Sequence, residues 1–307
     1  MSRQVLFANM KDPLPASGYW RACANLDAPY GEQTFKIRPM QTLLLDYERI
    51  VAGLSAPVAQ FTALSLYETV GSTNDVVRDH ANSDVLAGVV VLAEEQTHGR
   101  GRRGRAWHSP AGGNLYLSMG WEFDLALERL SGLSLAVGAM LAEAFSREFN
   151  IDLQLKWPND FYYDGRKLGG ILVEILPERH ERQRLVLGIG LNVTMPSSEP
   201  PPIDRPWTDM TAVIGAPIDR NELAAVIIDN VTRGFMEFET RGLPHWLERW
   251  RSRDFLLGRS VTVNNPSPLT GTAAGVNEEG ALLIEAPAGQ CAVAGGEVSV
   301  LEFGELS

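Results

Sequence analysis

The sequence predicts an α+β protein with two unequal parts: a main domain of strands and helices, and a small C-terminal β-barrel. Between residues 41 and 256, short apolar runs typical of strands are interspersed with segments of helical periodicity. From Gly258 onward, short β-type runs alternate with Gly, Asn and Pro turns over about 50 residues. We therefore expect an irregular N-terminal extension over residues 1–40, the main domain over 41–256 and the barrel over 257–307.

The expected elements follow from these patterns in chain order. Residues 1–40 have no clear period, so no element is expected there. The strands expected in the main domain are 62–70, 88–93, 114–121, 152–157, 168–176 and 184–193. The helices are 41–54, a short one that Ser72 or Thr73 caps and that ends near His80, 131–149, 219–240 and 243–252. A loop is expected at 195–206, and barrel strands at 260–264, 281–285, 291–294 and 298–302.

The composition excludes several classes of function. The 307 residues include 27 Lys and Arg against 38 Asp and Glu, so the net charge of −11 argues against a whole-surface affinity for nucleic acid or an anionic membrane. Cys23 and Cys291 form no CxxC pattern, which favours a reducing compartment. The uncharged run at 130–142 is shorter than the ~20 residues of a membrane span, and the five histidines show no metal-binding spacing. We expect a cytoplasmic protein, and we assign no metal ligands.

The densest signal is the segment GRGRRGRAW at 99–107, where four of the six residues from 100 to 105 are arginines. It matches G-x-G-x-x-G, but the dinucleotide-binding fingerprint must open a helix and the continuation WHSPAGG does not form one. A nucleic-acid-binding RGG segment is disfavoured because the motif is single and short, and a solvated loop explains the charge but not the glycines. The pattern favours a mobile loop that closes over an anionic, phosphate-bearing intermediate.

Three further segments combine strand ends with polar groups. KWPND at 156–160 places Asn159 and Asp160 at the end of a strand, where simple turn formation is an equal alternative. Lys167 follows an Asp-Gly hairpin turn and is one of only four lysines; a solvated strand end is the usual explanation, but a role beside a carboxylate and a phosphate is also open. In GIGLNV at 188–193 the glycines indicate close backbone approach, and Asn192 can donate to and accept from a heterocycle.

Together these segments resemble the biotin protein ligase family. The runs that carry the resemblance, in the family's order and spacing, are GSTN at 71–74, GRGRRGRAW at 99–107, KWPND at 156–160, GRKLGGILVE at 165–174 and GIGLNV at 188–193. The resemblance covers roughly residues 60–305. It implies a mixed-sheet catalytic domain of the biotin/lipoate ligase type and an SH3-like C-terminal barrel.

The resemblance also implies an activity. With ATP and Mg²⁺, the protein would convert biotin to biotinyl-5′-adenylate and then transfer biotin to one lysine of a biotin carboxyl carrier domain of a carboxylase. A lipoate or octanoate ligase of the same fold is the alternative within the fold. A biotin-adenylate-responsive regulator is the alternative from another class, but residues 1–60 show no helix-turn-helix pattern. We therefore expect a form without an N-terminal DNA-binding domain, with a homodimer as an open question.

The resemblance finally assigns roles to residues. Those expected to bind biotin are Ser72, Thr73, Gln96, Gly99, Arg100, Trp107 and Gly170. Those expected to bind the nucleotide are Arg102, Arg105, Lys167, Asn159, Asn192 and Trp207. The catalytic residues would be Lys167 beside the biotin carboxylate and α-phosphate, Arg102 for retention of the adenylate, and Asp160 for the incoming acceptor lysine. Magnesium would be bound mainly through the nucleotide.

Overall fold

The computed structural model describes residues 44–81, 85–195, 203, 205–265 and 267–301. The expected N-terminal extension over residues 1–40 lies outside the described residues. The described chain contains a seven-stranded sheet and a five-stranded sheet, as the predicted α+β class requires. None of the described helices is both long enough and apolar enough to cross a membrane.

The large sheet is mixed. Its strands lie in the order β1 (Ala63–Val70), β2 (Val89–Gln96), β3 (Leu115–Phe123), β7 (Arg182–Leu191), β6 (Arg166–Arg179), β5 (Asp160–Tyr163) and β4 (Gln154–Lys156). The strands β1 and β2 run parallel, joined by the crossover helix α3 (Thr73–His80), and every other neighbouring pair is antiparallel. The middle of this sheet carries apolar side chains on both faces, which requires cover on both sides.

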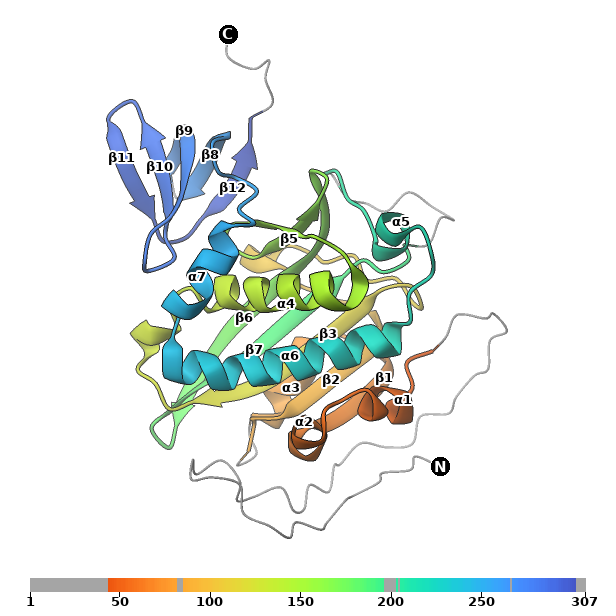
Figure 1. The fold of residues 1–307 in the computed structure, drawn as a ribbon. Helices are drawn as coiled ribbons and strands as arrows, with labels where there is room; N and C mark the ends of the chain where they lie inside the picture. Colours follow the sequence, from red (N-terminus) through yellow and green to blue (C-terminus); the bar gives the residue numbers. More distant parts are fainter. Residues whose placement is uncertain (1–43, 82–84, 196–202, 204, 266, 302–307) are drawn as a thin grey trace.

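Helices cover the two faces unequally. On one face lie α4 (Leu133–Phe149), α6 (Arg220–Arg241) and α7 (Pro244–Arg251), and Figure 1 shows α4 and α6 extending across the sheet. Val90 and Leu92 of β2 belong to the large core on that face, whereas Val89 and Val91 belong to a small core under α3. The alternation within β2 therefore explains why its VVVL run is buried on both sides.

The C-terminal sheet is entirely antiparallel. Its strand order is β11 (Gly289–Val293), β10 (Leu282–Ala286), β9 (Ser267–Val276), β8 (Ser260–Asn265) and β12 (Glu297–Val300). The loops of this sheet contact the main domain, because Trp157 Nε1 donates to Gly280 O at 3.0 Å and Ser131 Oγ to Glu279 O at 2.9 Å. The expected boundary between residues 256 and 257 stays a prediction.

Several expected elements differ from the structure. The helix expected at 41–54 is shorter in the described part, where α1 spans Tyr47–Ala52 and Gly53 is its C-cap residue. A second short helix, α2 (Ala56–Phe61), carries Pro57 in its first turn and was not expected. The strand expected at 152–157 is shorter, and β5 and β9 were not expected. The short helices α5 (Met210–Ile214), η2 (Arg102–Gly104) and η3 (Leu127–Leu130) were not expected either.

Candidate active site

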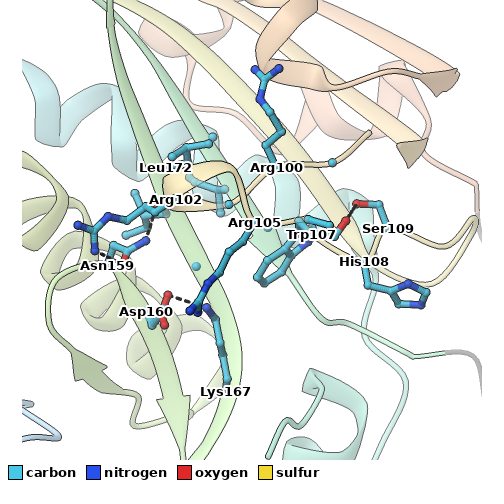
Figure 2. A pocket seen from close by; sticks show the side chains of 18 of the residues that line it. Arg100, Arg102, Arg105, Trp107, His108, Ser109, Asn159, Asp160, Lys167 and Leu172 are labelled. Atoms are coloured by element: carbon cyan, nitrogen blue, oxygen red, sulfur yellow. Dashed lines mark hydrogen bonds and ion pairs between the residues drawn. The ribbon is translucent and has the colours of Figure 1, made fainter. Parts of the chain in front are cut away.

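One cavity of about 680 Å³ lies between the large sheet, the arginine-rich segment and the start of β12. All fourteen residues singled out in the sequence line it. Its volume lies within the range of small-molecule and cofactor sites. Figure 2 shows that the labelled side chains come from separate parts of the chain and converge from opposite sides. The fold thus brings together the segments that the sequence analysis considered separately.

A polar cup forms one end of the cavity, where α3 begins beside β2. Gln96 Oε1 accepts from Thr73 N at 2.9 Å and from Thr73 Oγ1 at 3.1 Å, and Gln96 Nε2 donates to Ser109 Oγ at 3.0 Å. Ser72 is the N-cap residue of α3 and is buried, but its side chain makes no capping hydrogen bond. The cup therefore offers hydroxyl and amide groups in a water-poor place, which suits a small polar ring.

Asn74 and Ser118 belong to the same cup, and the sequence analysis assigned them no role. Ser118 Oγ lies 2.6 Å from Asn74 Oδ1 and 2.7 Å from Thr73 Oγ1, and both residues are buried. A Cβ at Gly188 would lie 2.4 Å from Asn74 Oδ1, so glycine is required for this close approach. Asn74 could have been predicted from the sequence, because it completes the GSTN run. Ser118 could not, because it lies in an apolar strand that carries no motif.

Lys167 and Asp160 face each other across β5 and β6. Lys167 Nζ lies 2.7 Å from Asp160 Oδ1, and both side chains are only 15–16% exposed. A Cβ at Gly170 would lie 3.1 Å from Asp160 Oδ1 and 3.6 Å from Lys167 Nζ, so there is little room for a side chain beside this pair. The arrangement provides a cation and a base next to each other, in a place where solvent screens charge weakly.

The segment that follows β7 is fixed by backbone pairing to β6. Lys167 N donates to Pro206 O at 3.0 Å and Thr208 N donates to Lys167 O at 2.9 Å, which holds Trp207 beside Lys167. Asn192 is buried, and its Nδ2 donates to Thr208 O at 3.0 Å. Trp207 and Asn192, the two residues expected to recognise the nucleotide base, therefore lie at the same end of the cavity.

The arginine-rich segment forms a small hairpin above the cavity. Trp107 N donates to Gly99 O at 2.8 Å and Gly101 N donates to Arg105 O at 2.7 Å. At its tip, Arg103 has φ 57° and Gly104 has φ 74°, and glycine suits this left-handed conformation. We call residues 99–107 the arginine hairpin. Its expected closure onto a ligand stays a prediction.

Arg100, Arg102 and Arg105 of the hairpin point in different directions (Figure 2). Arg100 turns away from the cavity and binds Asp75 through both terminal nitrogens, at 2.7 and 2.8 Å. Arg105 forms an ion pair with Glu297 of β12, and Arg103 Nη1 donates to Asn264 O at 3.2 Å. Among the described residues, the hydrogen bond of the Arg102 side chain goes to a neutral group, Asn159 Oδ1, at 3.4 Å. Burial lowers the pKa of Arg102, while the charges of Asp160 and Glu297 act in the opposite direction.

Trp107 is the part of the hairpin that touches the sheet. A Cβ at Gly190 would lie 2.7 Å from the Trp107 ring, and Lys167 Nζ lies 5.3 Å from the centre of that ring. The indole Nε1 is buried and has no hydrogen-bond partner among the described residues. Trp107 therefore separates the polar cup from the Lys167–Asp160 pair.

Lys156 is a further cation lining the cavity, and the sequence analysis gave it no role. Burial lowers its pKa, although the nearby charge of Asp160 acts in the opposite direction. Its Nζ lies 3.3 Å from the Tyr162 hydroxyl and 5.1 Å from the centre of that ring. The scarcity of lysine in this sequence was the observation that could have identified Lys156 as a candidate. In the described part of the chain, no cluster of three or more His, Cys, Asp or Glu could hold a metal ion.

The same segments match known proteins. The model of the Biotin/lipoate A/B protein ligase family matches residues 66–192, and that of the Biotin protein ligase C terminal domain matches residues 256–301. The chain is 35% identical to the bifunctional ligase/repressor BirA of Escherichia coli, over 78% of this chain and 74% of the relative. It is 31% identical to the biotin--[acetyl-CoA-carboxylase] ligase of Mycobacterium tuberculosis, over 76% of this chain and 88% of the relative.

Among solved structures, the biotin protein ligase from Aquifex aeolicus in complex with biotin and ATP has a TM-score of 0.67 and 29% identity, covering 78% of this chain and 98% of that one. The chain belongs to the biotin protein ligase family. The resemblance, the enzyme class and the fold class, including the SH3-like C-terminal domain, are thereby confirmed, and the lipoate or octanoate alternative is not favoured. The expected lack of an N-terminal DNA-binding domain stays a prediction. It concerns residues 1–60, of which residues 1–43 lie outside the described residues.

Proposed function

We propose that the protein is an ATP-dependent biotin–protein ligase in which the roles predicted from the sequence are carried out within this one cavity. The observation that carries the proposal is the union of a neutral polar cup with a group of cations in a single space. The cup suits the ureido ring of biotin, and the cations suit a carboxylate beside a triphosphate. Neither half alone would distinguish an acyl-adenylate enzyme from a simple binding protein.

Biotin would enter with its ring in the cup and its carboxylate toward Lys167. Ser72, Thr73 and Gln96 are the groups we assign to the ureido ring, and Gly99 and Gly170 leave room for the bicycle and its chain. Arg100 would contribute through the backbone of the hairpin, because its guanidinium binds Asp75 and Glu174. Trp107 would cover the side of the ligand and limit the access of water.

In the first step, a biotin carboxylate oxygen attacks the α-phosphorus of ATP. An O–P bond forms, the bond between the α-phosphorus and the bridging oxygen breaks, and pyrophosphate leaves. Two anions must approach each other, so a fixed cation between them lowers the barrier most. Lys167 supplies that charge, and the Asp160 carboxylate 2.7 Å away holds it in place. No nucleophile of the enzyme is required.

In the second step, the acceptor lysine amine attacks the acyl carbon of the adenylate. An N–C bond forms, the C–O bond to the phosphate breaks, and AMP leaves with the electron pair. The amine must lose a proton, and we assign Asp160 to orient it or to accept that proton. This requires Lys167 to turn toward the phosphate, which releases the Asp160 carboxylate.

The remaining cations and the base-binding residues would hold the nucleotide. We assign Arg102 to the α-phosphate, Arg105 and Lys156 to the other phosphates, and Asn159 to the position of Arg102. Asn192 and Trp207 would bind adenine. Magnesium, when bound, supplies charge neutralisation on the phosphates. We place it on the nucleotide, in keeping with the absence of a metal-ligating cluster among the described residues.

We propose that the acceptor is the biotin carboxyl carrier domain of a carboxylase. We also propose that the protein acts in the cytoplasm and has no nucleic-acid partner. The test uses labelled biotin, ATP, Mg²⁺ and a purified carrier domain, with lipoate and octanoate as competing substrates. The expected result is covalent label on one carrier lysine, dependent on ATP and abolished by EDTA. Transfer of lipoate but not biotin would overturn the proposal, and ATP-independent binding of biotin without transfer would indicate a binding protein.

A further inference from the structure

The charged side chains of Asp75, Arg78, Arg100 and Glu174 form a cluster whose ion pairs have no role in the reaction described above. Asp75 of α3 accepts both terminal nitrogens of Arg100, and Arg100 Nη2 also lies 3.5 Å from Glu174 Oε2. Arg78, one turn further along α3, lies 2.6 Å from Asp75 and 2.7 Å from Glu174. Two guanidinium groups and two carboxylates therefore balance each other, and Arg100 brings the hairpin into this cluster.

This geometry is specific to guanidinium and carboxylate groups. A forked pair uses two parallel hydrogen bonds, so it fixes the direction of the Arg100 side chain as well as its distance. The side chain of Arg100 is 32% exposed and that of Asp75 is 41% exposed, so the pair is partly screened. The hydrogen bond to Asp75 raises the pKa of Arg100, so the pair keeps the guanidinium charged.

The cluster also connects to the polar cup. Glu174 Oε2 accepts from Asn74 Nδ2 at 2.5 Å, and Asn74 Oδ1 lies 2.6 Å from Ser118 Oγ. Ser118 Oγ lies 2.7 Å from Thr73 Oγ1, which reaches Gln96. The same chain of hydrogen bonds thus fixes the cup at one end and the hairpin at the other.

We infer that Asp75 is a positioning residue: by holding the Arg100 guanidinium on the outer side of the hairpin, it keeps Arg102 above the cavity before any ligand binds. Arg100 and Arg102 are two residues apart in an extended stem, so fixing one limits where the other can point. The stem amides of Gly101 and Trp107, which donate within the hairpin, report whether the stem is formed. The inference rests on the proposed function only in assigning Arg102 to the adenylate.

The test measures amide hydrogen exchange of residues 99–107 in the ligand-free protein, with Asp75→Asn compared with Asp79→Asn. Asp79 is an exposed carboxylate on the same helix with no assigned role, so it controls for the loss of one charge from α3. We expect Asp75→Asn to speed exchange of the hairpin amides by roughly five- to tenfold, the scale of a good partly exposed ion pair. The β3 amides should not change.

A double variant separates positioning from a general effect. In an Arg100→Gln background, Asp75→Asn should add little further exchange, because it acts through Arg100. An additive effect, equal rates in Asp75→Asn and Asp79→Asn, or faster exchange in β3 as well would each overturn the inference. These readouts need no catalysis, so a failed ligase assay with the expected exchange pattern would reject the proposed function and leave the positioning role standing. With an active ligase, Asp75→Asn should release more adenylate than Asp79→Asn does.

Discussion

The floor and the roof of the cavity are built by different physical means. The floor consists of side chains from strands and the start of α3, such as Thr73, Gln96 and Lys167, which are buried or nearly so and bound over short distances. The roof is the arginine hairpin, and it is fixed by ion pairs whose side chains are between a quarter and a half exposed. Packing fixes the floor, whereas partly screened charges fix the roof.

This difference implies different functional consequences. We assign the floor side chains to the reacting atoms, where weak screening makes each charge count strongly. With the predicted closure of the hairpin, we expect a change in the roof to shift an equilibrium between covering and opening, because exposed pairs contribute about 1 kcal/mol or less each. We therefore expect floor variants to lose chemistry and roof variants to lose retention of the intermediate.

The largest effect is expected for the floor cation. Lys167→Ala should lower the rate of adenylate formation by about 10²- to 10³-fold, because the fixed cation that we place between the carboxylate and the α-phosphate is then missing. Pyrophosphate release checks the rate, and calorimetric titration with biotin alone should still show binding. Arg166→Ala, an exposed basic neighbour on the same strand, is the control. Equal losses in both variants would mean that Lys167 acts only through general charge.

The roof cation should behave in the opposite way. Arg102→Gly should allow adenylate formation but release the adenylate about ten- to a hundredfold faster, because its guanidinium lines the cavity and hydrogen-bonds a neutral group there. The measurement is indiscriminate labelling of lysines on a bystander protein. Arg103→Gly, which removes an outward-pointing arginine, should leak far less. An unfolded Arg102→Gly protein, or one without adenylate synthesis, would show that Arg102 is needed for folding or for adenylation, as the floor residues are, and not for retention alone.

The sequence predicted most of the floor, apart from Asn74, Ser118 and Lys156, and only part of the roof. Short motifs specify the floor, because turns and glycines adjacent to Asp160, Gly170 and Asn192 fix how those strands end, and every predicted site residue lines the cavity. The partners of the roof arginines were not predictable in this way. Asp75 lies 25 residues from Arg100 and Glu297 lies 192 residues from Arg105, and neither spacing has a local signal.

The missed elements have a similar explanation. The strand β9 has the sequence SPLTGTAAGV, in which one Pro, two Gly and two Ala interrupt the branched residues that strand prediction depends on, and pairing with β8 and β10 forms it nonetheless. The helix α2 begins beyond the expected 41–54 pattern, and its six residues are too few for a helical period to be recognised.

The contact between Trp107 of the hairpin and Gly190 of β7 joins the roof to the floor directly. We expect changes there to have an effect smaller than that of the two cations. Gly190→Ala would place a Cβ 2.7 Å from the Trp107 ring, which requires the indole to move. We expect adenylate release to rise about tenfold while adenylation continues. In a Trp107→Ala background the same change should have little effect, because the obstructed ring is gone. Gly188→Ala serves as a contrast, since its Cβ would meet Asn74 of the polar cup and should weaken biotin binding rather than retention of the adenylate. Additive effects of the two changes would contradict the contact.

The smallest effect is expected where the floor meets the C-terminal sheet. Asp254 pairs with Leu155 of β4, accepts from Leu256 N at 2.8 Å through Oδ1, and leaves Oδ2 buried without a partner among the described residues. Burial raises its pKa to about 6. A raised carboxyl pKa means that the folded protein binds the proton more tightly than the unfolded chain does, so this group lowers the free energy of unfolding as pH rises from about 4 to about 6.

Asp254→Asn removes that ionisation while keeping an oxygen that accepts from Leu256 N. The penalty in the wild type above pH 6 is on the order of 1–3 kcal/mol, because each unit of pKa shift corresponds to about 1.4 kcal/mol. The variant should therefore gain a few degrees in Tm relative to wild type at pH 8 and little at pH 4.5, measured by thermal denaturation. The difference between the two pH values is the informative quantity, because the asparagine amide also lacks a partner at both. Asp124→Asn, on the exposed surface, should show no such difference. A gain that is equal at both pH values would show that the unpartnered oxygen, and not its charge, weakens this junction, and the floor would then owe its stability to packing alone.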